Sequence, residues 1–87
     1  MTRDNEDKFD QVKSVLMMIV DDQSIPKNIR RAAKTSIDTL NSDKMTDAVR
    51  AYGVIRRLDN ASQEPNCPLH ARTRMWQIVS VLETVMD

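Results

Sequence analysis

The other helices can be placed relative to Asp21-Asp22-Gln23-Ser24-Ile25-Pro26-Lys27-Asn28-Ile29-Arg30-Arg31-Ala32-Ala33, where the chain first turns back on itself. It holds the end of one helix, the start of the next and the densest basic face of the sequence. Ser24 is a residue type that caps helix N-termini, and Pro26 suits a first helical turn, where its missing N–H costs nothing. Because the connection is only a few residues long, it predicts two antiparallel helices packed side by side.

Apolar residues at helical spacing define these two helices. The first is predicted over about residues 4–22 and the second from Pro26 to about Leu40. Met17 and Met18 fall outside the inner face of the first helix, so we expect them to be exposed, either without a role or as a contact for a partner. The predicted inner faces carry Phe9, Val12, Leu16, Ile19 and Val20, and then Ile29, Ala33, Ser36, Ile37 and Leu40.

Two more helices follow the turn Asn41-Ser42-Asp43, whose residue types stop one helix and cap another. The third helix is predicted over about residues 44–61. Pro65 and Pro68 predict a loop over residues 62–69, and the fourth helix then runs from near Pro68 to the chain end. The predicted inner faces carry Met45, Ala48, Ala51, Tyr52, Ile55 and Leu58, and then Ala71, Met75, Ile78, Val79, Leu82, Val85 and Met86.

The composition agrees with a helical fold. One glycine and three prolines in 87 residues leave little material for the turns of β-hairpins. A hydrophobic share of 40% beside 30% charged residues is typical of a globular domain. Two tight turns and one longer loop therefore predict an all-α, four-helix up-and-down bundle, in a single domain over residues 1–87.

The sequence argues against a secreted or membrane protein. No apolar run approaches the ~18 residues that a membrane span needs, and the first eight residues are polar and acidic, unlike a signal peptide. The single cysteine, Cys67, has no second cysteine with which to form an internal disulfide. We therefore expect a cytoplasmic protein that does not contact a membrane.

Charge is unevenly distributed although the net charge is zero. Residues 1–24 carry three Lys/Arg against six Asp/Glu, residues 25–58 carry eight against three, and residues 59–87 carry two against four. An acidic partner is therefore expected to contact the middle of the chain.

Two groups of residues in this basic segment form the first part of a candidate interaction surface. Lys27, Arg31 and Lys34 share the outer side of the second helix. Arg50, Gly53 and Arg57 are predicted to share the outer side of the third helix. A glycine in mid-helix costs about 1 kcal/mol relative to alanine, and it permits close approach of another backbone or a ligand. An anionic or acidic partner is one interpretation of this arrangement, and tight helix packing or neutral drift is the other.

The fourth helix adds Arg72 and Trp76, which complete the surface. They are one turn apart, the separation at which a guanidinium packs on an indole ring. We expect the loop over residues 62–69 to cover Trp76, and the alternative is an exposed binding hot spot. A separate expectation is an ion pair between Arg30 and one of the two aspartates in the first turn, Asp21 or Asp22.

Catalytic and metal chemistry find little support. Cys67 and His70 form half of a zinc-binding pattern, and no second pair exists to complete it. His70 is the only histidine, so we predict that it caps a helix or ties a loop. No catalytic residue, metal ligand or cofactor is predicted, and the protein is not expected to be an enzyme.

The function predicted from these features is that of a protein-interaction module, with self-association as one form. The alternative is nucleic-acid binding through the basic faces of the second and third helices. An aromatic share of 3% and the lack of an RNA-binding signature count against it, and the salt dependence of binding distinguishes the two.

A family resemblance rests on two segments and on Trp76. Ile25-Pro26-Lys27-Asn28-Ile29-Arg30-Arg31-Ala32-Ala33, together with Pro65-Asn66-Cys67-Pro68-Leu69-His70-Ala71-Arg72-Thr73, resembles a small archaeal family catalogued as an uncharacterised protein family. The resemblance covers essentially the whole chain, and it implies a compact four-helix bundle of bromodomain-like, mirror-handed up-and-down topology. It carries no established activity, so it implies no functional residues.

Overall fold

A computed structural model describes residues 3–87 of the chain. They form α1 (Arg3–Val20), α2 (Lys27–Asn41), α3 (Asp47–Ser62) and α4 (Leu69–Leu82), and no strand is present within these residues. The prediction of an all-α, four-helix bundle is confirmed. Met1 and Thr2, part of the predicted domain, lie outside the described residues.

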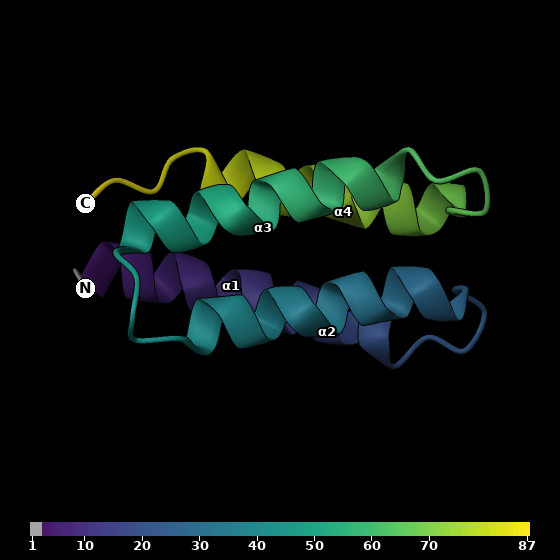
Figure 1. Ribbon diagram of the computed structural model, residues 1–87, viewed down its shortest axis with the longest axis horizontal. Helices are drawn as coiled ribbons and strands as arrows, with labels where there is room; N and C mark the ends of the chain where they lie inside the picture. The colour runs from purple at the N-terminus through teal and green to yellow at the C-terminus, as the bar shows by residue number, and fades with distance from the viewer. Residues whose placement is uncertain (1–2) are drawn as a thin grey trace.

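The four helices run along the long axis of a body that measures 35 × 19 × 19 Å (Figure 1). Each helix packs against two neighbours, in the order α1, α2, α3, α4 and back to α1. Both chain ends and the α2–α3 turn lie at one end, here called the terminal end, and the other two connections lie at the opposite end (Figure 1). A single cluster of buried apolar side chains fills the centre, including Phe9, Leu16, Ile29, Val54, Leu58, Met75 and Ile78.

The α1–α2 turn differs in detail from its prediction. Ser24 does not cap α2, because Pro26 occupies the N-cap position and its carbonyl oxygen accepts from the N–H of Arg30 at 3.0 Å. Ser24 instead donates its N–H and its hydroxyl to Asp22 Oδ1, at 2.9 Å and 2.6 Å. The predicted ion pair of Arg30 is wrong, since its Nε donates to the carbonyl of Ile25 at 2.9 Å.

Helix α3 begins later than predicted. Its N-cap is Thr46, whose hydroxyl oxygen accepts from the N–H of Val49 at 3.3 Å. The hydroxyl of Ser42 closes a local turn with the N–H of Lys44, also at 3.3 Å, and so does not cap the helix. Residues 43–46 are consequently a connection with exposed side chains, not the first turn of a helix.

The inner face of α3 was predicted with the wrong rotation. Tyr52 and Met45 are 60% and 39% exposed, whereas Val54, absent from the predicted face, is fully buried. The prediction followed the apolar residues alone, but the true inner face also contains the charged pair Asp47 and Arg50. Burial follows helical spacing once this pair is included.

Helix α4 ends at Leu82, short of the predicted chain end. The hydroxyl of Thr84 donates to the carbonyl of Val81 at 2.6 Å, and beyond it Val85 is buried whereas Met86 is 75% exposed. The carboxylate of Asp87 accepts from the N–H of Ala48 at 2.8 Å. The tail thus caps the first turn of α3, where a negative charge is favoured.

Candidate interaction surface on α3

Arg50 does not belong to the surface predicted from the sequence, because its side chain is buried at the terminal end. It pairs with Asp47 one turn earlier, and these two side chains are 10% and 11% exposed. Its Nη1 donates to the carbonyls of Leu40 and Ser42, at 2.8 Å and 3.0 Å, and its guanidinium carbon lies 4.9 Å from the centre of the Phe9 ring. Arg50 therefore satisfies carbonyls at the C-terminal end of α2, a structural role that its position in the sequence did not indicate.

Asn5 completes this buried polar cluster from α1. Its Nδ2 donates to Asp47 Oδ2 at 3.0 Å and to the carbonyl of Met86 at 2.6 Å. The hydrogen bond from Asn5, helped by Arg50, holds the pKa of Asp47 below its usual value. The cluster ties α1, the α2–α3 turn, α3 and the C-terminal tail together.

Acid is expected to destabilise the protein partly through Asp47. Its folded-state pKa is lowered, so as the pH falls the unfolded chain takes up this proton first, near its pKa of about 3.9. The stability contributed by the carboxylate is complete above that pKa and is lost as the pH falls through the lower, folded-state pKa. Urea unfolding as a function of pH measures this loss. The Asp47→Asn variant should show a shallower acid limb, and an unchanged limb would contradict the assignment.

The exposed side of α3 forms a groove of about 530 Å³ against α2. Tyr52 and Val49 are 60% and 52% exposed, and the guanidinium of Arg56 lies 5.9 Å from the centre of the Tyr52 ring. We call this hollow the α2–α3 groove, and its lining residues are Thr39, Met45, Val49, Tyr52, Gly53, Arg56, Arg57 and Asn60. It joins apolar side chains to two cations and contains no carboxylate.

Two residues of the predicted surface, Gly53 and Arg57, do line this groove. Arg57 is half-buried and its Nη1 donates to the hydroxyl of Thr39 at 3.2 Å. A Cβ atom built on Gly53 would meet only Thr39 Cγ2, at 3.9 Å, which is ordinary van der Waals contact. The bundle itself therefore does not require glycine at this position.

The sequence-based prediction assigned Tyr52 to the core and omitted Val49. The helical phase set by Val54 was the signal that would have placed both outside.

Replacing Gly53 by alanine is expected to raise the free energy of unfolding by about 0.5–1 kcal/mol. The added methyl group has room, and alanine lowers the conformational entropy that the helix loses on folding. Urea or thermal unfolding of the purified protein measures the change. A decrease in stability would show that the backbone of α3 is under a packing constraint.

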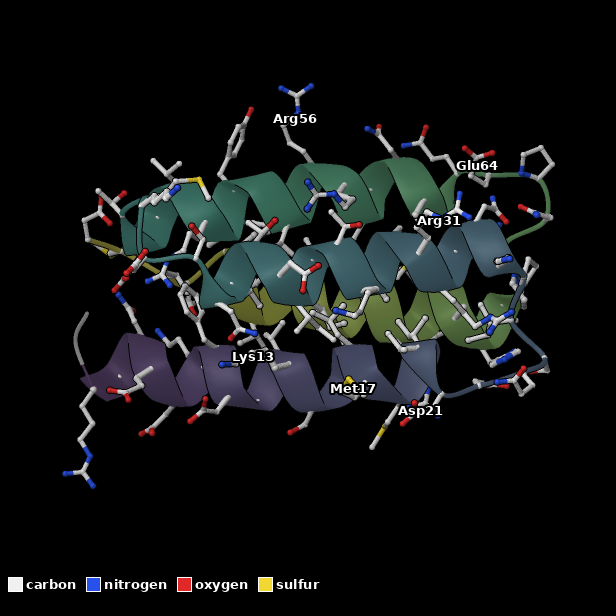
Figure 2. The ribbon with its side chains drawn as sticks, turned by 60° about the horizontal axis from the view of Figure 1, so that its bottom comes forward. Lys13, Met17, Asp21, Arg31, Arg56 and Glu64 are labelled. Atoms are coloured by element: carbon white, nitrogen blue, oxygen red, sulfur yellow. The ribbon has the colours of Figure 1, made fainter. Side chains whose placement is uncertain are left out.

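The basic face of α2 is exposed as predicted. Lys27, Arg31 and Lys34 all lie outside the core, and Lys34 pairs with Asp38 at 3.0 Å. Arg31 on α2 and Arg56 on α3 both lie on the outside of the bundle (Figure 2). None of the three α2 cations lines the α2–α3 groove, so they form a separate, neighbouring surface.

The prediction that the 62–69 loop covers Trp76 is wrong. Trp76 is 53% exposed, and Leu69 in the first turn of α4 is 68% exposed. Arg72 does not stack on the indole, because its Nε donates to the carbonyl of Ser62 at 2.9 Å and so satisfies the C-terminal turn of α3. Arg72 is structural, and Trp76 remains an isolated exposed aromatic on α4.

His70 ties α4 to the α1–α2 turn, in line with its predicted role. Its Nε2 lies 3.2 Å from Asp22 Oδ2 and 3.3 Å from the hydroxyl of Ser24. Hydrogen bonds from Ser24, with a smaller effect of His70, hold the pKa of Asp22 below its usual value. Both contacts use one ring nitrogen, whereas a nucleophile–base–orienter triad needs one partner on each nitrogen.

A hydrogen-bonded pair of amides, Asn28 with Asn66 at 2.9 Å, holds the same end of the bundle.

Cys67 does not combine with His70 into a metal site. Burial raises the pKa of the Cys67 thiol, which disfavours the thiolate that binds zinc. Among residues 3–87, no group of three His, Cys, Asp or Glu side chains is arranged to hold a metal ion.

No helix in the same part of the chain has the length and apolar character to cross a membrane.

The fold and the surface together define a class, that of a small antiparallel four-helix bundle with an open apolar and basic groove. Within that class, the chain belongs to the uncharacterised protein family UPF0147, whose model matches residues 1–85. This confirms the family resemblance inferred from the sequence. The handedness implied by that resemblance stays a prediction.

Relatives and solved structures agree with this membership. A UPF0147 protein of Aeropyrum pernix is 45% identical over 84 residues, which cover 97% of this chain and 92% of that protein. One from Saccharolobus solfataricus is 48% identical over 87 residues, covering 100% and 98%. The crystal structure of the unknown-function protein MMP1188 superposes with a TM-score of 0.91 at 40% identity, covering 94% and 93%. A UPF0147 structure from Thermoplasma acidophilum gives 0.89 at 30% identity, covering 98% and 100%.

Proposed function

We propose that this chain is a non-enzymatic, cytoplasmic protein-interaction module whose partner docks in the α2–α3 groove. The observation that carries the proposal is the exposure of Tyr52 and Val49 beside Arg56 and Arg57 in one hollow. Tyrosine and arginine are enriched among the residues that dominate binding energy at protein interfaces. Covering Tyr52 and Val49 removes apolar surface from water, which favours binding.

The lining of the groove sets the chemistry of the partner. No carboxylate lies beside Arg56 and Arg57 in the lining. A partner surface that complements the groove therefore carries apolar side chains next to an acidic group. The only histidine, His70, is occupied in tying the first turn of α4 to the α1–α2 turn at the opposite end of the bundle, which supports a binding role over a catalytic one.

Nucleic-acid binding is the second candidate, and the observation that favours it is the exposed basic face of α2. Lys27 and Arg31 are exposed there, and Arg56 projects from the neighbouring helix. In this case affinity for RNA or DNA would fall steeply with salt, with a slope set by the number of phosphates contacted.

Site-specific photocrosslinking tests the proposal. A photoreactive residue is placed at Val49 in the groove or, as a control, at Ser14 on the exposed side of α1, and each purified variant is added to nuclease-treated cytoplasmic extract. The proposal expects protein adducts at Val49, few at Ser14, and a loss of the Val49 adducts in a Tyr52→Ala background. Equal labelling at both positions would contradict it. Adducts that form only when nuclease is omitted would favour the second candidate.

A further inference from the structure

We propose that the partner of the α2–α3 groove is an amphipathic helix of another protein, with acidic residues placed about one to two turns from its apolar residues. The inference rests on the proposed function and names the class of its partner. It is carried by the charge of the groove, which two arginines and no carboxylate line, and by the order of the side chains along α3.

Arg56 and Arg57 are cations without an anionic neighbour. Within residues 3–87, neither forms an ion pair with a carboxylate. Arg57 is half-buried and uses Nη1 to donate to Thr39, while the guanidinium of Arg56 lies 5.9 Å from the centre of the Tyr52 ring. These contacts keep both guanidinium groups at the groove, where a carboxylate can accept charge-assisted hydrogen bonds from them. The charge that complements the lining is therefore negative.

Apolar and basic side chains occupy different parts of α3. Val49 and Tyr52 lie in its first two turns, and Arg56 and Arg57 lie in its third. At about 1.5 Å per residue, Arg56 is about 11 Å from Val49 and about 6 Å from Tyr52 along the helix axis. A partner that covers all of them therefore carries its carboxylates about one to two turns from its apolar side chains, on the same face.

The walls of the groove favour a helix over an extended peptide. They are formed by α3 and, through Thr39, by α2, two helices that pack against each other. Residues 3–87 contain no strand whose edge an extended peptide could join. A helix laid along α3 presents side chains three and four positions apart on one face. Val49, Tyr52 and Arg56 have the same spacing, so the two helices can match along their length.

Gly53 allows such a helix to come close to α3. It lines the groove one turn from Val49 and one turn from Arg57, between the apolar and the basic part. A Cβ built there would meet only Thr39 Cγ2, at 3.9 Å, so the bundle does not need the glycine. A docked helix gains from it, because two backbones approach more closely where no side chain separates them. This contact gives a reason for the about 1 kcal/mol that a mid-helix glycine costs.

Selection from a random peptide library tests the chemistry of the partner. The library is displayed on phage and panned at physiological salt against the purified protein and, as a control, against a Tyr52→Glu/Arg56→Glu variant whose melting is checked. Peptides that bind only the unchanged protein are expected to combine Asp or Glu with apolar residues at helical spacing. They should become helical on binding, as measured by NMR. Enrichment of basic peptides, an extended bound conformation, or no enrichment over the variant would overturn the proposal.

Charge reversal tests where the acidic residues dock. For the tightest selected peptide, Arg56→Glu is expected to weaken binding at least about tenfold by fluorescence anisotropy, because it sets two carboxylates against each other. Lys27→Glu is the matched control, since it makes the same change of charge at an exposed position of α2 outside the lining. It should weaken binding less than about threefold. A peptide with lysine in place of its acidic residues should bind Arg56→Glu better than the unchanged protein. Equal losses from both variants would mean that binding follows net charge alone, and would overturn the proposal.

The inference and the proposed function fail in different ways. Protein adducts at Val49 that map to a partner segment without acidic residues would overturn the acidic helix and still support the proposed function. If no protein adducts form at Val49 and no peptide is enriched, both are wrong.

Discussion

Replacing Arg50 by alanine is expected to lower the free energy of unfolding by about 3–5 kcal/mol, the usual cost of removing one partner of a buried ion pair. The substitution leaves Asp47 without its cation, and it removes the donors to the carbonyls of Leu40 and Ser42. The Phe9 ring also loses the guanidinium that covers it. Equilibrium urea unfolding measures the change.

Arg56→Ala is the matched control for Arg50→Ala, since it removes the same side chain from an exposed position of the same helix. Its effect on stability should stay within about 0.5 kcal/mol. If the two variants are equally stable, the polar cluster of Asn5, Asp47 and Arg50 is solvated and its structural role is wrong.

Replacing Phe9 by alanine is expected to have the second large effect and to lower the free energy of unfolding by about 3–5 kcal/mol. The ring is 1% exposed and packs in the central core while one face supports the guanidinium of Arg50. The substitution leaves a cavity in the core. A bundle of 87 residues has a small core, so this loss is a large part of its stability. Thermal and urea unfolding both measure this loss.

A double-mutant cycle separates packing from the cation–π contact. Phe9→Leu retains an apolar side chain and should cost about 1.5 kcal/mol or less. Combined with Arg50→Met, it should show a coupling energy of about 0.5–2 kcal/mol, the range for a guanidinium over an aromatic face. Strictly additive effects would mean that the ring acts through its volume alone.

These two side chains also bear on the groove. Arg50 holds the carbonyl of Ser42, and the chain between Ser42 and Thr46 carries Met45, which lines the α2–α3 groove. The buried cluster at the terminal end therefore positions one end of the surface through which we propose that the protein acts. Variants in the cluster should affect binding through the shape of the α2–α3 turn.

Much of the bundle was predictable because the spacing of apolar residues and the positions of the prolines both indicate the helices that the structure contains. On α1, the spacing of Phe9, Val12, Leu16 and Ile19 gave the buried stripe correctly. The exposure of Met17 and Met18 followed from the same spacing. Prolines marked the starts of α2 and α4 to within a residue, since a proline cannot continue a preceding helix.

The α3 surface was predicted only in part, because charged residues were assumed to lie outside. Arg50 is buried with Asp47, and this pair shifts the helical face so that Tyr52 turns outward. Gly53 and Arg57 were recognised and do line the groove. Trp76 was expected beneath a loop and is exposed on α4 instead, and Arg72, expected to pack on its ring, donates to the carbonyl of Ser62.

Local sequence signals were enough to predict that the chain is helical, where three of its four helices begin, and which stripe of α1 and α2 is buried. Those features arise from contacts within a turn or two of the chain, which spacing and residue type encode directly. The rotation of α3, the burial of Arg50 and the α2–α3 groove depend instead on how the helices pack together. The partners of Arg50 come from α1, the end of α2 and the following turn, and only folding brings those segments to its guanidinium.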